Sequence, residues 1–315
     1  MLRPVDLLEE QLALRLAAYR SKAPFRGHDT AEAKLRGFLG PIHELGEVRV
    51  LRHGSRVEAA IAWRRDDGSW FGPPVYTVAI DQRSGADVEG WLAEVLAEVV
   101  PTLDADLDLL VDAQYRETYR ALGRVGVGVD SIQLIGDVER AARELRRAPM
   151  PEGVRLERLT VDHVEPILAL YAETFAAEPE YCWFGAHPSY LSRQREKLEA
   201  TLASPGHLEL VLLTERGPRG HASATVDQEN AFWGPTAGMS LCFAPELRGR
   251  GVLRPVYGAL LDGMRERGAV AFKGGTSQPA VMRLGLEMGR VLQGVNMKRH
   301  VHFDEAHFAP YLPLR

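Results

Sequence analysis

The chain has 315 residues, of which 45% are hydrophobic and 26% are charged, as expected for a globular protein with a sizeable core. Its formal net charge of −5 argues against nucleic acid as the main partner, because phosphate backbones select basic surfaces. The start of the chain has no signal-peptide pattern, and no apolar run approaches the ~18 residues of a membrane span. We therefore expect a cytoplasmic protein that binds neither nucleic acid nor membrane. Its two cysteines, Cys182 and Cys242, lie in apolar stretches, which favours small buried side chains over a disulfide.

The first part of the chain is predicted to be a mixed α/β unit. Apolar residues recur at helical spacing from Val5 to Tyr19, and a second short helix is expected to begin after Asp29-Thr30 and to stop at Gly40-Pro41. The following elements are predicted in the order three strands, helix, strand, helix and strand, at 47–52, 56–64, 75–80, 86–100, 107–111, 113–122 and 127–135.

A charged stretch of helical composition then runs from Asp137 to Arg147 and is stopped by Pro149 and Pro151. Proline disfavours helix in the residue before it, so we predict a linker at 137–152 between domains at 1–136 and 153–315. The second domain repeats the element order of the first. Its predicted elements are a strand at 154–158, a helix around 164–175, a helix from 189, strands at 208–213, 221–226 and 239–244, a helix, a strand at 270–273, a helix at 279–288 and a strand at 291–301.

Two sequence matches at one spacing indicate an internal duplication. The stretch from Gly123 to Asp130 shares Gly, Arg, Val, Gly and Val with the stretch from Gly289 to Asn296, 166 residues later. At the same spacing, Gln82-x-x-Gly85 falls on Arg248-x-x-Gly251. Internal repetition predicts two similar structural units.

The most informative stretch is the Arg- and Gly-rich loop that follows the apolar strand ending at Ala244. It leads into a helix whose Leu253, Val256, Leu260 and Met264 fall on one face. The first N–H groups of a helix have no internal partner and the helix dipole favours negative charge there, so a loop at this point is an anion site. Its glycines let the backbone approach a ligand or adopt positive φ, and its arginines add positive charge. The sequence therefore predicts a pyrophosphate cradle.

This loop resembles the coenzyme A loop of the GCN5-related N-acetyltransferases, Gln/Arg-x-x-Gly-x-Gly/Ala, and the stretch from Thr276 to Arg290 resembles the family's next landmark. The resemblance implies an α/β (α+β mixed-sheet) fold with two tandem acyl-CoA N-acyltransferase-like domains and acetyl-CoA, or another acyl-CoA, as cofactor. The residues that it assigns to the cofactor are Phe243, Ala244, Arg248, Gly249, Arg250, Gly251, Val252, Leu253 and Ser277. The sequence departs from the family at Leu253, where Gly or Ala is usual, and at Gly285, where the family often has a Tyr that acts as the general acid. Tyr119 takes that position in the first copy.

Charge favours the second copy as the cofactor site. The first loop carries Asp81, Asp87 and Glu89 around its helix start. Each such carboxylate stabilises the empty helix and opposes a pyrophosphate by roughly 0.3–1 kcal/mol at an exposed terminus. The second loop carries arginines instead.

The family's reaction is attack of an amine on a thioester, which requires a general base or a water relay. Among the nearest polar residues, Asp227 and Glu229 are candidate bases and Ser240 is a candidate water-holder; the alternative for the stretch from Asp227 to Asn230 is a solvated turn. The aromatic stretch from Glu178 to Tyr190 suits either an acceptor pocket for a cationic or amphipathic amine or the interface between the domains.

No metal site is predicted, since alternation along a terminal strand explains His300 and His302. The predicted function is N-acyl transfer from coenzyme A to the amine of a small molecule, with the cofactor in the second domain; a homodimer is compatible with the sequence. The alternatives are a non-catalytic coenzyme A-binding or structural double domain, and an aminoacyl transferase that uses charged tRNA. The acidic charge balance argues against the last of these.

Overall fold

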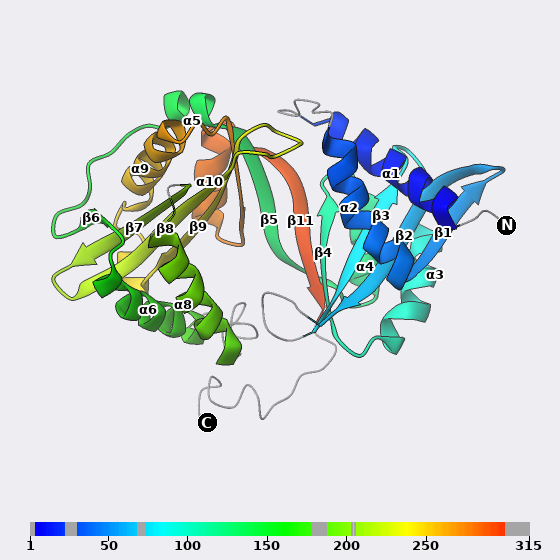
Figure 1. Cartoon of the computed structure of the whole chain (residues 1–315), viewed down its shortest axis with the longest axis horizontal. Helices are drawn as coiled ribbons and strands as arrows, with labels where there is room; N and C mark the ends of the chain where they lie inside the picture. Colours follow the sequence, from blue (N-terminus) through cyan, green and yellow to red (C-terminus); the bar gives the residue numbers. More distant parts are fainter. Residues whose placement is uncertain are drawn as a thin grey trace.

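The computed structural model describes residues 4–22, 30–67, 74–177, 188–202, 204 and 206–299. These residues form one eleven-stranded mixed sheet in the order β1-β2-β3-β4-β11-β5-β10-β9-β8-β7-β6, with helices on both faces (Figure 1). The strands are β1 (Glu47–His53), β2 (Arg56–Asp66), β3 (Val75–Gln82), β4 (Asp106–Asp112), β5 (Gly128–Asp137), β6 (Arg155–Arg158), β7 (His207–Thr214), β8 (Gly217–Asp227), β9 (Thr236–Phe243), β10 (Ala271–Thr276) and β11 (Val291–Arg299). The helices are α1 (Pro4–Arg20), α2 (Thr30–Leu45), α3 (Glu89–Val99), α4 (Arg116–Arg124), α5 (Val138–Glu144), α6 (Val164–Ala177), α8 (Pro188–Leu202), α9 (Leu253–Glu266) and α10 (Pro279–Glu287).

The two halves of the chain exchange their last strands. β11, the last strand of the second half, lies between β4 and β5 and is antiparallel to both. β5, the last strand of the first half, pairs with β10 of the second half. The sheet is therefore continuous through the middle of the molecule, where β5 and β11 run side by side between the two helix-covered ends (Figure 1).

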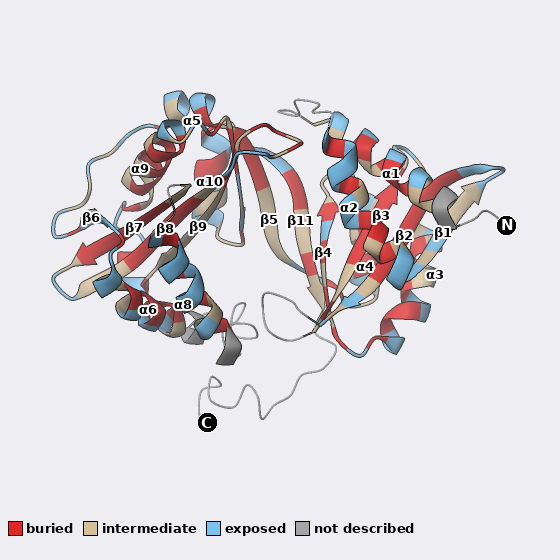
Figure 2. Cartoon of the chain, in the orientation of Figure 1, coloured by how far each residue is buried: buried red, intermediate tan, exposed pale blue. Residues whose placement is uncertain are grey.

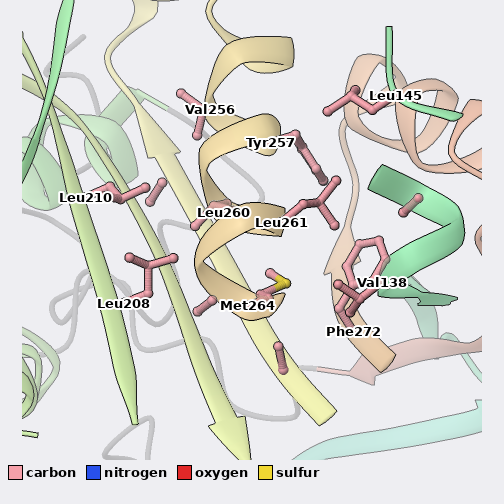
Figure 3. Packing of buried hydrophobic residues seen from close by; sticks show 14 of the residues in the cluster. Val138, Leu145, Leu208, Leu210, Val256, Tyr257, Leu260, Leu261, Met264 and Phe272 are labelled. Carbon is pink, nitrogen blue, oxygen red and sulfur yellow. The ribbon is translucent and has the colours of Figure 1, made fainter. Parts of the chain in front are cut away.

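The largest core of the second half forms around α9. Val256, Leu260 and Met264 of this helix are almost fully buried in a cluster with residues of β7, β8 and α5. In Figure 3, Val256 and Leu260 lie on the side of β7, whereas Tyr257 and Leu261 lie on the side of α5. Fully burying a side chain of this size stabilises the fold by about 1.5–3 kcal/mol. Figure 2 shows that α9 turns its buried face toward the sheet and keeps an exposed face outside, which confirms the amphipathic pattern expected from the sequence.

The loop between β8 and β9 joins the two halves on the sheet face opposite to α9. Its Phe232 ring stacks on Tyr19 of α1, with 4.6 Å between ring centroids. The neighbouring Trp233 is 1% exposed and packs with Ile135 of β5 and Ala271 of β10. This loop therefore ties the first helix of the chain to the centre of the sheet.

Most of the predicted elements are present within a few residues, but the expected end of the second helix is wrong. α2 runs through Pro41 to Leu45 instead of stopping at Gly40-Pro41. A proline inside a helix removes one backbone hydrogen bond. Here Leu39 and Ile42 on either side are almost fully buried, and this packing holds the helix together.

The repeat of element order is present, but the 166-residue spacing does not match the structure at the final helix and strand of each half. The left-handed glycine that follows the helix is Gly126 (φ 77°) after α4 and Gly289 (φ 74°) after α10. These two glycines are 163 residues apart, as are the first residues of the two helices, Arg116 and Pro279. Gly123 lies inside α4, so its sequence match with Gly289 does not join equivalent positions.

Candidate functional site

Two neighbouring parallel strands separate at their carboxyl ends in each half of the sheet. In the second half, β9 and β10 pair only from Thr236 to Gly238 and from Ala271 to Lys273, although β9 continues to Phe243 and β10 to Thr276. We call this opening the second splay. The first splay lies between β3 and β4, whose pairing also stops after three residues.

The stretch from Arg248 to Val252, here called the glycine loop, joins β9 to α9 at the mouth of the second splay. Gly249 and Gly251 have φ values of 75° and 81°, a region that side-chain-bearing residues rarely adopt. A Cβ placed on either glycine would meet no heavy atom within 4 Å, so the space beside the loop is open. α9 then begins at Leu253 without a side-chain cap and without an acidic residue in its first turn. Its first N–H groups are therefore available to an anion.

Leu253, the main departure from the family pattern, turns into the protein. Its half-buried side chain packs against the core around α9. The side chain of Val252 is buried as well, and so is that of Ala244. The structure thus brings the predicted residues from Phe243 to Leu253 together in one loop, and Ser277 follows the end of β10 across the splay.

The three arginines of this region differ in their surroundings. Arg254 pairs with Glu287 of α10 at 2.5 Å, and Arg250 donates to the carbonyl oxygen of Glu152 at 3.2 Å. The charge of Arg248 reaches the thiol of Cys242 on β9. Burial raises the pKa of this thiol to about 11, against the opposing effects of a hydrogen bond to Thr174 and of Arg248. Arg248 is therefore the arginine whose charge extends over the end of β9.

At the first splay, a carboxylate of the protein itself lies at the helix start. α3 begins with Glu89, which pairs with Arg124 at 2.6 Å and with Arg120 at 3.4 Å. Gly85 keeps a positive φ and open space, as Gly251 does. The predicted carboxylate Asp81 is not at this helix start: it lies in β3, buried, and accepts a hydrogen bond from Arg15 at 2.8 Å. A carboxylate thus already stabilises the start of α3.

Side chains of the first half also connect the separated ends of β3 and β4. Thr118 of α4 donates to the Gln82 side chain at the end of β3, at 2.7 Å, and both residues are buried. Tyr115, which follows β4, is 2% exposed. Burial raises the pKa of its phenol, which also feels the charges of Asp81 and Asp112. Its side chain therefore reaches from the end of β4 toward β3.

Tyr119, which the repeat had placed at the family's acid position, has a structural role here. Its hydroxyl donates to the carbonyl oxygen of Asp112 at 2.7 Å, and burial raises its pKa. Gly285, which the 166-residue spacing matched with Tyr119, allows α10 to approach the sheet, because a Cβ there would lie 2.9 Å from Leu134 Cδ1.

Of the three predicted catalytic residues, only Ser240 lies in the second splay. Asp227 pairs with Thr236 at the start of β9, four residues from Ser240, which corresponds to about 13 Å along a strand. The Asp227 carboxylate accepts from the N–H of Glu229 at 3.1 Å and from the side chain of Asn230 at 3.3 Å. This is a turn held by its own side chains, so the structure does not bring Asp227 and Glu229 to the glycine loop.

Sequence reasoning missed three buried polar residues on the sheet face that carries Ser240. Tyr171 of α6 lies 2.6 Å from Nδ1 of His221 on β8, and Nε2 of His221 lies 2.8 Å from Glu209 Oε2 on β7. The only sequence signal was a single Glu inside an otherwise apolar strand.

Arg219 anchors the turn before the glycine loop. Its guanidinium pairs with Glu246 of that turn at 2.5 Å and with Glu173 of α6 at 2.8 Å. Its carbonyl oxygen accepts from the N–H of Ala244 at 2.9 Å. Hydrogen bonds from Arg219 lower the pKa of both carboxyl groups below 4.5.

We expect Arg219→Met to be less stable than the wild type by about 0.5–1 kcal/mol at pH 7, since both carboxylates are partly exposed. A lowered carboxyl pKa contributes stability that is present above the ordinary value of 4.5 and lost as the pH falls through the lowered value. The difference between the two proteins should therefore shrink below about pH 4. Urea unfolding at pH 7 and pH 3 measures it, and an equal difference at both pH values would contradict the role given to Arg219.

Among the residues that the structure describes, no helix is long and apolar enough to span a membrane, and no group of three or more His, Cys, Asp or Glu could hold a metal ion. The histidines at 300, 302 and 307 lie outside the described residues. So does 178–187, most of the aromatic stretch predicted for the acceptor pocket or the domain interface.

A mixed sheet with a splay beside a glycine loop and an uncapped helix start defines an α/β fold of the acyl-CoA N-acyltransferase type. No protein-family model matches the sequence, and no curated protein sequence matches it. The fold is similar to that of a GCN5-related N-acetyltransferase from Sphaerobacter thermophilus, with a TM-score of 0.57 and 14% identity over 96% of this chain and 95% of that chain. It is also similar to the GCN5-related glucosamine N-acetyltransferase region of a fungal multi-domain GH3 beta-N-acetylglucosaminidase, with a TM-score of 0.51 and 14% identity over 94% of this chain and 37% of that one. The chain has the GCN5-related N-acetyltransferase fold.

Proposed function

We propose that the protein transfers an acetyl or other acyl group from coenzyme A to the amine of a small molecule, with the cofactor at the second splay. The observation that carries this proposal is the difference between two otherwise similar helix starts. α9 begins beside two open glycines and has no acid in its first turn, whereas α3 begins with the ion-paired Glu89. An anionic cofactor is favoured at the first of these and opposed at the second.

The residues of the second splay fit a coenzyme A pyrophosphate. The N–H groups of the glycine loop and of the α9 start would hold it, and Arg248 would add positive charge. Coenzyme A would supply an acyl group activated as a thioester. In the reaction, a carbon–nitrogen bond forms to the acyl carbon as the carbon–sulfur bond breaks, one proton leaves the amine and the departing sulfur takes up one proton to give the thiol. The acceptor amine is proposed on the sheet face that exposes Ser240 and Lys273.

The domain division at 1–136, 137–152 and 153–315 remains part of this proposal. α5, within the proposed linker, packs Val138, Ala141 and Leu145 into the core around α9. The linker helix therefore belongs structurally to the proposed cofactor-binding unit.

Two matched glycine substitutions test the site. Gly251→Ala and Gly85→Ala both place a Cβ at a positive φ in open space, so each should lower stability by about 1 kcal/mol. Only Gly251→Ala should weaken acetyl-CoA binding, because its Cβ occupies the space beside the cradle. The measurement is the shift in melting temperature caused by acetyl-CoA. At 100 times the dissociation constant, ligand binding raises the free energy of unfolding by about 2.7 kcal/mol.

Equal loss of the shift in both variants, or a loss confined to Gly85→Ala, would move the site away from the second splay. Release of free thiol across a panel of amines separates catalysis from binding. A shift in the wild type without any thiol release would instead favour a non-catalytic coenzyme A-binding protein.

A further inference from the structure

Three buried polar side chains from three elements meet under α6. Glu209 is 7% exposed, His221 is 3% exposed and Tyr171 is 8% exposed. The hydroxyl of Tyr171 lies 2.6 Å from His221 Nδ1, and His221 Nε2 lies 2.8 Å from Glu209 Oε2. A carboxylate, an imidazole and a hydroxyl thus form a continuous chain in the interior.

The protonation of this chain follows from its burial. Burial raises the pKa of Tyr171 well above its ordinary value, so the phenol stays protonated and donates to His221 Nδ1. A neutral imidazole then carries its single proton on Nε2, facing Glu209. The contact between Nε2 and Oε2 is short, but the two atoms are not aligned as a hydrogen bond. Among the described residues, Glu209 Oε2 has no aligned donor, and a buried charged oxygen of this kind is costly for the fold, which is more typical of functional sites than of structural ones.

The strand register connects this chain to the second splay. Glu209 of β7 pairs with Ser223 of β8, and Ser223 pairs with Ser240 of β9. Side chains of directly paired residues on one face lie about 4.5–5.5 Å apart at Cβ. Ser223 is buried and Ser240 is exposed, so a row of polar side chains leads from the interior carboxylate to the solvent side of β9. His221 of β8 pairs with Cys242 of β9, which lies beyond the point where β9 separates from β10.

We propose, on the basis of the proposed function, that the pair of Glu209 and His221 accepts the proton that the substrate amine must lose. The proton would travel from the second splay to this pair through Ser240, Ser223 and water. The ammonium form of the amine loses one proton to the His221–Glu209 pair. The free amine nitrogen then bonds to the acyl carbon as the carbon–sulfur bond breaks, and its second proton goes to the departing sulfur to give the thiol. The stored proton returns to solvent after the thiol has left. Tyr171 is a positioning residue, because it sets which nitrogen of His221 carries the proton.

The charged and titratable groups around the pair come from every neighbouring element. They are Tyr171 on α6, Tyr190 on α8, Cys242 on β9, His207 on β7 and Arg219 on β8 with its partners Glu173 and Glu246. Burial raises the pKa of both tyrosines and of the cysteine, so these groups stay neutral near pH 7. Arg219 is already paired with two carboxylates. Within the described part of the chain, Glu209 is therefore the carboxylate in contact with His221.

The test compares Glu209→Gln with Glu165→Gln, an exposed carboxylate on α6 that serves as the control. Glu209→Gln keeps the shape of the side chain and removes its charge. Its kcat/KM for the amine should fall by about 100-fold or more at pH 7, the scale of a lost general base. Without the carboxylate, the proton acceptor loses its negative charge, so the pH–rate profile should differ from that of the wild type. Glu165→Gln should keep both the wild-type rate and the wild-type profile.

The acetyl-CoA thermal shift separates the two levels of the proposal. A normal shift in Glu209→Gln together with the lost rate and moved profile supports the inference, whereas wild-type rate and profile in that variant overturn it. If the wild type shows neither a thermal shift with acetyl-CoA nor thiol release, the proposed function itself is wrong. If Glu209→Gln does not fold, Tyr171→Phe provides the test: kcat should fall about tenfold with KM and the thermal shift unchanged, and an unchanged kcat would overturn the role of the chain.

Discussion

Replacing Trp233 with alanine is expected to cost about 3–5 kcal/mol of unfolding free energy. Trp233 is 1% exposed and ranks first by volume among the fully buried side chains of the described part of the chain. It packs against Ile135 and Ala271, and its ring centroid lies 5.8 Å from that of Tyr19. The substitution would leave a cavity at the point where α1 of the first half meets strands β5 and β10. Against a total stability of about 5–15 kcal/mol, this is a large effect.

Equilibrium urea unfolding of Trp233→Ala and of the wild type measures the difference. Leu286→Ala, on a side chain that is 55% exposed, is the control and should stay within about 0.5 kcal/mol of the wild type. A loss below about 1.5 kcal/mol for Trp233→Ala would mean that the loop between β8 and β9 does not tie the halves together.

The same loop shows why proximity in sequence did not reveal where the candidate bases lie. Asp227 and Glu229 precede Trp233, and they are the nearest carboxylates in sequence that come before the strand leading to the glycine loop. An antiparallel hairpin places residues close in sequence at one end of the strand pair, whereas the splay opens at the other end. Sequence distance alone does not reveal which end of a strand faces a site, but the strand register does.

Glu209 was missed for the opposite reason. It lies far from the glycine loop in sequence, and the two strand pairings that bring it beside Ser240 are not visible in the chain. The alternation of Leu208, Glu209 and Leu210 did contain the signal that one face of this strand differs from the other. The glycine loop was easier to predict, because its strand, its positive-φ glycines and its helix are consecutive in sequence.

Element order was also predictable from the sequence, whereas the exchange of the last strands was not. Hydrophobic periodicity identifies a strand such as β11 but not its neighbours. The placement of β11 between β4 and β5 depends on contacts between residues more than 150 positions apart. The 166-residue repeat predicted two similar units but carried no information on strand exchange, and it matched Gly123, inside α4, with Gly289, which follows α10.

The exchange has an energetic consequence at Gly294 in β11. A Cβ on this residue would lie 2.5 Å from the backbone oxygen of Val111 and 2.9 Å from Leu110 Cδ1, both on β4. A backbone atom cannot turn away as a side chain can, so Gly294→Ala must push β11 and β4 apart. We expect a loss of about 1–3 kcal/mol, the usual cost of overpacking.

Because β11 belongs to the second half and pairs with the first, loosening it should destabilise both halves in a single transition. Gly128→Ala in the adjacent β5 is the matched control, since the nearest atom to its Cβ would be 4.0 Å away, and its stability should be unchanged or slightly raised. Urea unfolding followed by amide hydrogen exchange distinguishes the outcomes. In Gly294→Ala, the amides of β4 and of β10 should lose protection together. Two separate transitions, or loosening confined to one half, would mean that the exchanged strands do not couple the halves into one folding unit.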